Sequence, residues 1–106
     1  MANPWAGEVE VVLDGRAHVA RLTLGALAEL EAALGAASLS ALVERFEAQS
    51  VSVRDVLAVV LAGLRGGGWT GTAEELGRAE LRGGVVEAAR VAATLLVRAF
   101  GAADAQ

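Results

Sequence analysis

The sequence contains neither cysteine nor lysine, and these two absences exclude several classes of site. Without cysteine the chain forms no disulfide, no thiolate metal site and no cysteine nucleophile. Without lysine it lacks the residue that follows the glycines of a P-loop. All nine basic residues are arginine, and with abundant alanine, glycine and valine this bias is typical of a GC-rich bacterial genome.

Basic clusters and long hydrophobic runs are also missing. The formal net charge is −4 and no stretch gathers arginines, so a nucleic-acid groove would lack its electrostatic footprint. Apolar runs are interrupted by Arg, Glu or Gly, and none approaches the roughly 20 residues that span a bilayer. Residues 1–7 have no signal pattern. We therefore expect a cytoplasmic bacterial protein with neither nucleic acid nor membrane as a partner.

The chain has the size of one ordinary domain, and no linker divides it, so we expect a single domain over residues 1–106. Hydrophobic residues make up 55% of the sequence but aromatic residues only 4%. Two Trp and two Phe are therefore expected to supply most of the bulk of the core. Residues 102–106 are expected to form a frayed tail.

Residues 8–24 have the pattern of a β-hairpin. Val9, Val11 and Leu13 recur at every second position, which is the period of a half-buried strand. Asp14-Gly15 follows as a two-residue turn signal, because glycine tolerates positive φ. Such a turn predicts that Leu13 lies opposite Arg16 and that Val11 lies opposite His18.

Residues 24–101 have the pattern of a helical part. Helices are predicted over about residues 24–34, 39–48, 53–65, 73–82 and 85–100, and Gly83-Gly84 either separates or merely bends the last two. Thr23, Ser52 and Thr72 are the expected N-caps, with Asp55 and Glu75 completing capping boxes. The helix after Ser52 is apolar almost all round and is expected at the centre. The predicted fold class is α+β: an N-terminal β-hairpin followed by four or five helices packed as a small bundle.

The period of the helices also predicts which side chains face inward. On the first helix these are Leu24, Leu27, Ala28, Leu30 and Leu34. On the last helix they are Val85, Ala88, Ala89, Ala92, Leu95, Leu96 and Ala99.

The residues form no familiar catalytic arrangement. His18 is the only histidine and lies mid-strand without a nucleophile or a second histidine placed with it, so a strand position is the better interpretation. Gly66-Gly67-Gly68 follows a helix rather than a strand, which favours a helix end over a phosphate loop. We predict no catalytic residue, no cofactor and no metal site.

An interaction module is the function class that remains. Trp69, beside the glycines, is either a lid on the core or an anchor for a partner, and the lid is favoured. The predicted partner-binding residues are Trp69, Trp5, Arg65 and Val12, from the loop around Trp69, the N-terminal segment and the hairpin edge. A homo-oligomer is expected if the central helix is not covered within one chain.

Several segments resemble the small proteins encoded in bacterial gene transfer agent clusters. They are Asn3 to Glu8, Leu13-Asp14-Gly15, Leu22 to Glu31, Ser38-Leu39 with Leu42 and Glu44-Arg45-Phe46, Leu61 to Gly68, and Gly83-Gly84. The resemblance covers nearly the whole chain. Members of this family are similar to phage tail assembly chaperones, and some descriptions instead make them tail tube components.

The resemblance implies tail morphogenesis without enzymatic activity. It implies the tape measure protein and the major tail protein as partners, and a location in the cytoplasm or on a particle. A chaperone that coats the tape measure protein is preferred, because one hairpin offers little strand for a continuous tube wall. The alternatives are a structural tail component retained in the gene transfer agent particle and an unrelated small protein-binding or regulatory module. An enzyme with an unfamiliar site is a further alternative.

Overall fold

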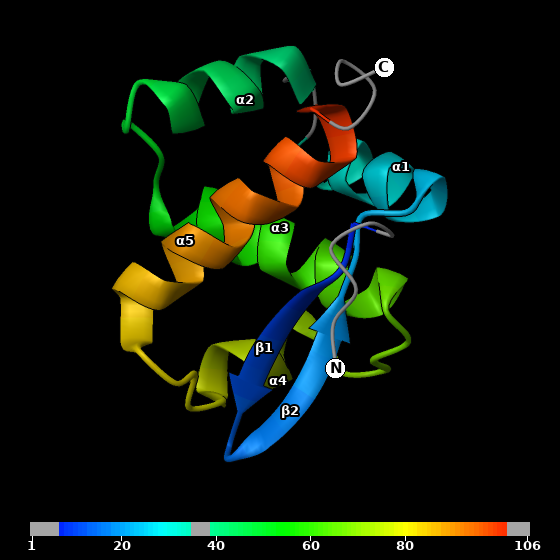
Figure 1. Ribbon diagram of the computed structural model, residues 1–106, viewed down its shortest axis with the longest axis vertical. Coiled ribbons are helices and arrows are strands. Elements are labelled where there is room, and N and C mark those ends of the chain that lie inside the picture. Colours follow the sequence, from blue (N-terminus) through cyan, green and yellow to red (C-terminus); the bar gives the residue numbers. More distant parts are fainter. Residues whose placement is uncertain (1–6, 35–38, 102–106) are drawn as a thin grey trace.

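The computed structural model describes residues 7–34 and 39–101, and the ends of the chain and the 35–38 connection are not described below. The chain begins with β1 (Val9–Leu13) and β2 (Arg16–Ala20). The helices are α1 (Leu24–Ala33), α2 (Leu39–Glu47), α3 (Val53–Gly66), α4 (Ala73–Arg78), α5 (Gly84–Leu96) and a π-helical turn, η2 (Val97–Gly101). The hairpin followed by helices is the predicted α+β fold (Figure 1). Trp5 and the tail at 102–106 lie outside the described residues.

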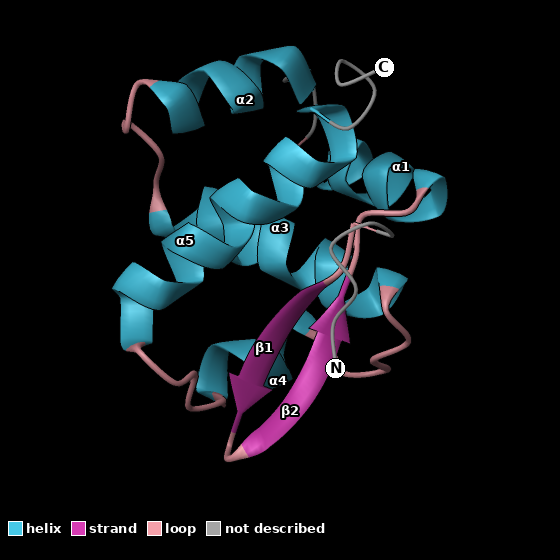
Figure 2. Ribbon diagram, in the orientation of Figure 1, coloured by secondary structure: helices cyan, strands magenta, loops and turns pink. Residues whose placement is uncertain are grey.

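The hairpin has the predicted register. Leu13 pairs with Arg16 and Val11 with His18 in an antiparallel ladder (Figure 2). Asp14 and Gly15 both have positive φ, of 49° and 81°, as a type I′ turn requires. Alternation places Val9, Val11 and Leu13 in the core. The local pattern therefore determined this element correctly.

The tip of the hairpin is tied to the connection between α4 and α5. The Asp14 backbone N–H donates to the Glu80 carbonyl oxygen at 2.8 Å, and the Arg82 N–H donates to the Val12 carbonyl oxygen at 3.0 Å. The Asp14 carboxylate accepts from the Glu80 N–H at 2.9 Å. Leu81 consequently forms a bridge with Leu13, so the helix predicted over 73–82 ends earlier, at Arg78.

The predicted caps are all formed. The Thr23 side chain accepts from the Ala26 N–H, and Ser52 and Thr72 form capping boxes with Asp55 and Glu75. These contacts satisfy backbone donors that a helix start otherwise leaves unpaired. The expected helix end at Gly35 lies outside the described residues.

Helix α3 lies at the centre, as its composition predicts. It packs against α1, α4, α5 and β2, while α5 also contacts β1 (Figure 1). The largest fully buried side chains are Leu30, Leu42, Leu64, Leu95, Val11, Val59, Val60 and Val91. The core of the described residues is therefore aliphatic.

Three expectations about the core were wrong. The described aromatic residues supply little of its bulk, since Phe46 and Trp69 are only partly buried and Phe100 is 37% exposed. The predicted stripe of α1 is wrong at Leu24, which is 87% exposed, and at Ala28, which is also exposed, because Ala26 and Leu30 face the core instead. Val85 is 66% exposed in the first turn of α5, which lies at the left edge of the molecule in Figure 1.

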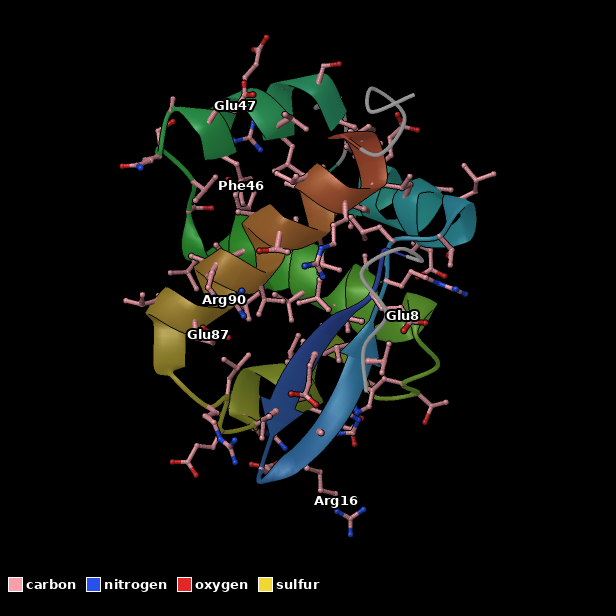
Figure 3. The ribbon with its side chains drawn as sticks, in the orientation of Figure 1. Glu8, Arg16, Phe46, Glu47, Glu87 and Arg90 are labelled. Atoms are coloured by element: carbon pink, nitrogen blue, oxygen red, sulfur yellow. The ribbon has the colours of Figure 1, made fainter. Side chains whose placement is uncertain are left out.

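An ion pair ties α2 to α3. The Arg45 guanidinium donates to both carboxylate oxygens of Asp55, at 3.1 Å each. The Asp55 side chain is only 14% exposed, and that of Arg45 is 33% exposed. The hydrogen bonds from Arg45 hold the pKa of Asp55 below its ordinary value of 3.8, against the opposing effect of burial. Nearby, Phe46 points from α2 toward α5 and Glu47 points away (Figure 3).

Replacing Asp55 with Asn is expected to lower the free energy of unfolding at pH 7 by about 1–2 kcal/mol. Because the pKa of Asp55 is lower in the folded chain, its charged form stabilises the fold above the ordinary pKa of 3.8. That stabilisation is lost as the pH falls through the folded pKa. Urea unfolding should therefore separate Asp55→Asn from the parent at pH 7 and bring the two together near pH 2.

Glu47→Gln is the matched control, because Glu47 is exposed on α2 and forms no ion pair among the described residues. It should change the unfolding free energy little at either pH. An Asp55→Asn difference that is equally large at pH 7 and pH 2 would contradict a contribution from the ionised carboxylate.

A candidate partner-binding groove

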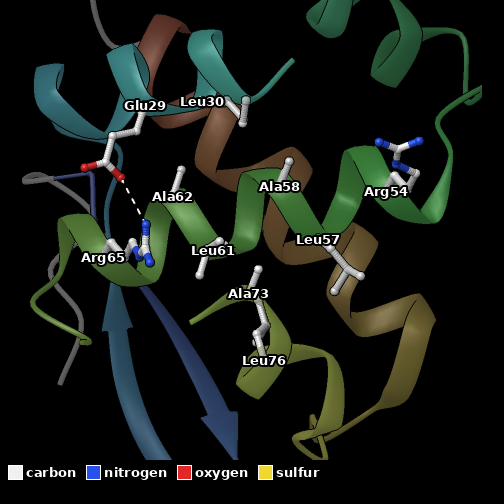
Figure 4. A pocket seen from close by; sticks show the side chains of 11 residues that line it. Glu29, Leu30, Arg54, Leu57, Ala58, Leu61, Ala62, Arg65, Ala73 and Leu76 are labelled. Atoms are coloured by element: carbon white, nitrogen blue, oxygen red, sulfur yellow. Dashed lines mark ion pairs between the residues drawn. The ribbon is translucent and has the colours of Figure 1, made fainter. Parts of the chain in front are cut away.

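An apolar groove lies between α1, α3 and α4 (Figure 4). Its floor is one face of α3, and its walls carry Leu30 and Ala33 from α1 and Ala73 and Leu76 from α4. Its volume is about 280 Å³. This is at or below the lower end of small-molecule pockets, which run from roughly 300 to 1,000 Å³. The groove is therefore better suited to a row of side chains than to a cofactor.

The floor of the groove follows the period of α3. The residues that α3 contributes are Arg54, Leu57, Ala58, Leu61, Ala62 and Arg65, which recur at spacings of three and four and so share one face. The opposite side of α3, with Val59 and Val60, is completely covered. Leu57 remains 37% exposed. The apolar surface of this helix exceeds what the described part of the chain covers.

Each end of the groove carries an arginine. The Arg65 guanidinium lies 3.6 Å from the Glu29 carboxylate and donates to the Gly71 carbonyl oxygen at 3.4 Å. Arg54, about three turns and roughly 16 Å away along α3, forms no ion pair with any described residue. In Figure 4, Arg65 points toward Glu29 of α1, and Arg54 lies near the start of α3. The arrangement is that of an apolar floor between two cationic ends.

A second, more polar hollow lies between β1 and α5, and two of its charged residues pair with each other. Arg90 donates to both carboxylate oxygens of Glu87, at 2.9 and 2.6 Å, and these hydrogen bonds lower the pKa of Glu87 (Figure 3). Arg98, also in this hollow, donates to the Glu8 carbonyl oxygen. The first pair lies within α5, and the second contact joins η2 to the residue before β1. Because the lining of this hollow is more polar than that of the groove along α3, it is the weaker candidate for an apolar partner.

The structure places the predicted partner-binding residues on different surfaces. Arg65 lines the apolar groove, whereas Val12 lies at β1 beside the polar hollow. Trp69 packs partly buried on the core with its indole against Gly71, which is the arrangement of a lid. Trp5 lies outside the described residues. Their roles in binding remain predictions.

Sequence reasoning did not identify Arg54, Leu57 and Leu61 as site residues. The signal was present, because these residues share a face with Arg65 on a helix that is apolar almost all round. The sequence does not show where α1 and α4 pack, and their packing leaves this face of α3 open. The apolar face alone did not distinguish a buried surface from a groove.

The glycine run and the histidine have structural positions. Gly67 lies directly against the backbone of β2 and Gly66 against that of Arg21 just after it, with no space for a side chain. His18 is half-buried in β2 opposite Val11.

Within residues 7–34 and 39–101, no three acidic or histidine side chains cluster as a metal site would require. In the same part of the chain, no helix combines the length and apolar character that crossing a bilayer demands.

Comparison with known proteins places the chain in a family. A family model described as "Phage tail tube protein, GTA-gp10" matches residues 6–102, which is nearly the whole chain. No curated protein and no solved structure matches the sequence.

Proposed function

The chain belongs to this gene transfer agent family of phage tail tube proteins, and on that premise we propose that it is a non-enzymatic structural component of a phage-like tail, retained in the finished particle. The observation that carries the proposal is the family match over residues 6–102. The preference for a chaperone drawn from the sequence is thereby reversed, because the family description names a tail tube protein. The proposed location is the particle.

Exposed aliphatic side chains support a structural role. Leu24 on α1 is 87% exposed and Val86 on α5 is 82% exposed, beside Val85 at 66%. A subunit of a ring touches its two neighbours through two different surfaces. Apolar side chains on separate helices could supply such surfaces, with the major tail protein or a further copy of this chain as the neighbour.

An assembly chaperone for the tape measure protein is the second candidate, and two observations favour it. The described sheet has two strands of five residues each, which is little material for a continuous β-wall. The open groove along α3 is the kind of surface that receives an amphipathic helix. A chaperone would leave before the particle is complete.

Protein composition of purified particles distinguishes the two roles. We expect quantitative mass spectrometry to find this protein in particles at a constant ratio to the major tail protein, which serves as the internal reference. Its absence from particles, combined with co-purification with the tape measure protein from lysates, would contradict retention and support the chaperone. Co-expression that makes the tape measure protein soluble would support the chaperone further.

A further inference from the structure

The apolar groove along α3 has the features of a docking site for a helix. We propose that it binds one acidic amphipathic α-helix of another tail protein, with apolar side chains against Leu57 and Leu61 and a carboxylate against Arg54. Only the source of the helix, a tail protein, rests on the proposed function. The groove chemistry itself depends on neither of the two tail roles.

The length and shape of the groove fit such a helix. Arg54 and Arg65 mark its ends about three helical turns apart, so a docked helix would contribute about three turns of apolar side chains. Leucine-sized side chains at i, i+3 or i+4 and i+7 would fall along Leu57 and Leu61. Ala58, Ala62 and Ala73 are small and let another backbone approach closely.

The charge around the groove selects an acidic partner. Its lining has two arginines and one glutamate, in a chain with a net charge of −4. Glu29 partly compensates Arg65, but no described carboxylate pairs with Arg54. Asp55 follows Arg54 in sequence, yet its carboxylate is held by Arg45. A carboxylate from a partner is therefore the missing counter-ion at the Arg54 end.

A second copy of this chain fits the groove poorly. The exposed large apolar side chains on the described helices occur singly or in pairs: Leu24, Val53 with Leu57, Val85 with Val86, and Val97 with Phe100. None of these sets by itself extends over three turns at spacings of three and four, and on the face that Val86 shares with Val97 the apolar stripe is interrupted by Arg90. The matching stripe must therefore come from a different helix, and self-association becomes an outcome of the test.

The absence of cysteine allows a site-specific reporter in the full-length protein. Ala33→Cys places one thiol on the wall of the groove, and Leu24→Cys places one on the same helix away from the groove. Each thiol is labelled with a polarity-sensitive maleimide dye. The probe is a synthetic 18-residue helical peptide with leucines at i, i+3, i+4, i+7 and i+11 and one glutamate at the Arg54 end. A control peptide carries arginine in place of that glutamate.

We expect the glutamate peptide to shift the emission of the Ala33→Cys reporter saturably and to leave the Leu24→Cys reporter unchanged. The arginine peptide should bind about fivefold more weakly, and Arg54→Glu in the labelled protein should reverse the order of the two peptides. Circular dichroism checks that each variant is folded, and Ala33 is exposed enough for substitution.

Three results would overturn the proposal. One is equal affinity for the two peptides in both the parent and Arg54→Glu backgrounds. Another is no saturable response at Ala33→Cys from folded protein. The third is a peptide-free dimer that Leu57→Asp dissociates, which would assign the groove to a second copy. Particle composition is measured independently, so absence from particles would refute the structural role without affecting this result.

Discussion

Replacing Gly67 with alanine is expected to lower the free energy of unfolding by about 3 kcal/mol or more, the upper part of the range for overpacking. Gly67 caps the end of α3 with φ −88° and ψ −1°, a conformation open to any residue. The requirement for glycine is therefore one of space. A Cβ at Gly67 would overlap the Val19 carbonyl oxygen, and a Cβ at Gly66 would overlap that of Arg21.

These obstructions are backbone atoms of β2 and of Arg21 just after it, which cannot rotate aside as a side chain can. Relief requires β2 to move away from α3, which would disturb the hydrogen bond from the Arg21 N–H to the Gly63 carbonyl oxygen, now 2.8 Å. Urea unfolding of Gly67→Ala measures the loss. In a domain whose total stability is typically about 5–15 kcal/mol, such a loss is a large fraction.

Gly77→Ala is the matched control. Gly77 lies in α4, is exposed, and has nothing within 4 Å of the position a Cβ would occupy. Alanine there should leave stability unchanged or raise it by up to about 1 kcal/mol, because it favours the helix. If Gly67→Ala proves as stable as Gly77→Ala, the close approach of α3 to β2 is wrong.

Leu95→Ala is expected to destabilise the protein by about 2–5 kcal/mol, through lost burial and the cavity left behind. Leu95 is 1% exposed and lies on α5 directly against Gly63 of α3. A Cβ at Gly63 would lie only 2.6 Å from Leu95 Cδ1, so Gly63→Ala in the parent is overpacked. Leu95→Ala leaves the contact between the two helices underpacked, whereas Gly63→Ala overpacks it.

The double variant Gly63→Ala/Leu95→Ala is therefore expected to be less damaged than the sum of the two single variants. The added methyl group fills part of the cavity, and the removed side chain relieves the overlap, so a favourable coupling of about 1 kcal/mol is expected. Unfolding free energies of the four proteins measure it. Strict additivity would contradict direct contact between these residues.

The elements that could be predicted are those that depend on neighbours in sequence. Alternation and the Asp14-Gly15 turn predicted the hairpin and its register, and Ser52 and Thr72 predicted capping boxes that are present. Each of these signals acts within a few residues, so it needs no knowledge of the rest of the chain.

The errors arose where distant segments compete. The helix predicted to reach residue 82 ends at Arg78 because Leu81 pairs with Leu13, far away in sequence. Leu24 has the spacing of a core residue, but Ala26 and Leu30 occupy the side of α1 that faces α3. Periodicity predicts a stripe, and only packing selects which stripe is buried.

The candidate site was anticipated only in part. Arg65 was among the predicted partner-binding residues, but Arg54 and Leu57 were not. Trp69 drew attention because an aromatic residue beside glycines is conspicuous, yet it packs against Gly71 and the core. The groove along α3 contains no residue that stands out in the sequence. It exists because α1 and α4 leave one apolar face of α3 uncovered.

The sequence by itself determined the hairpin, the helix starts, the central place of α3 and the lack of thiol and lysine chemistry. It did so because turns, caps and side-chain chemistry are properties of a few adjacent residues. Only the tertiary structure decided that Gly66 and Gly67 make room for β2, and that one face of α3 stays open between α1 and α4. Both features depend on how segments distant in sequence pack together. The local sequence of each segment would allow it to pack against several different neighbours.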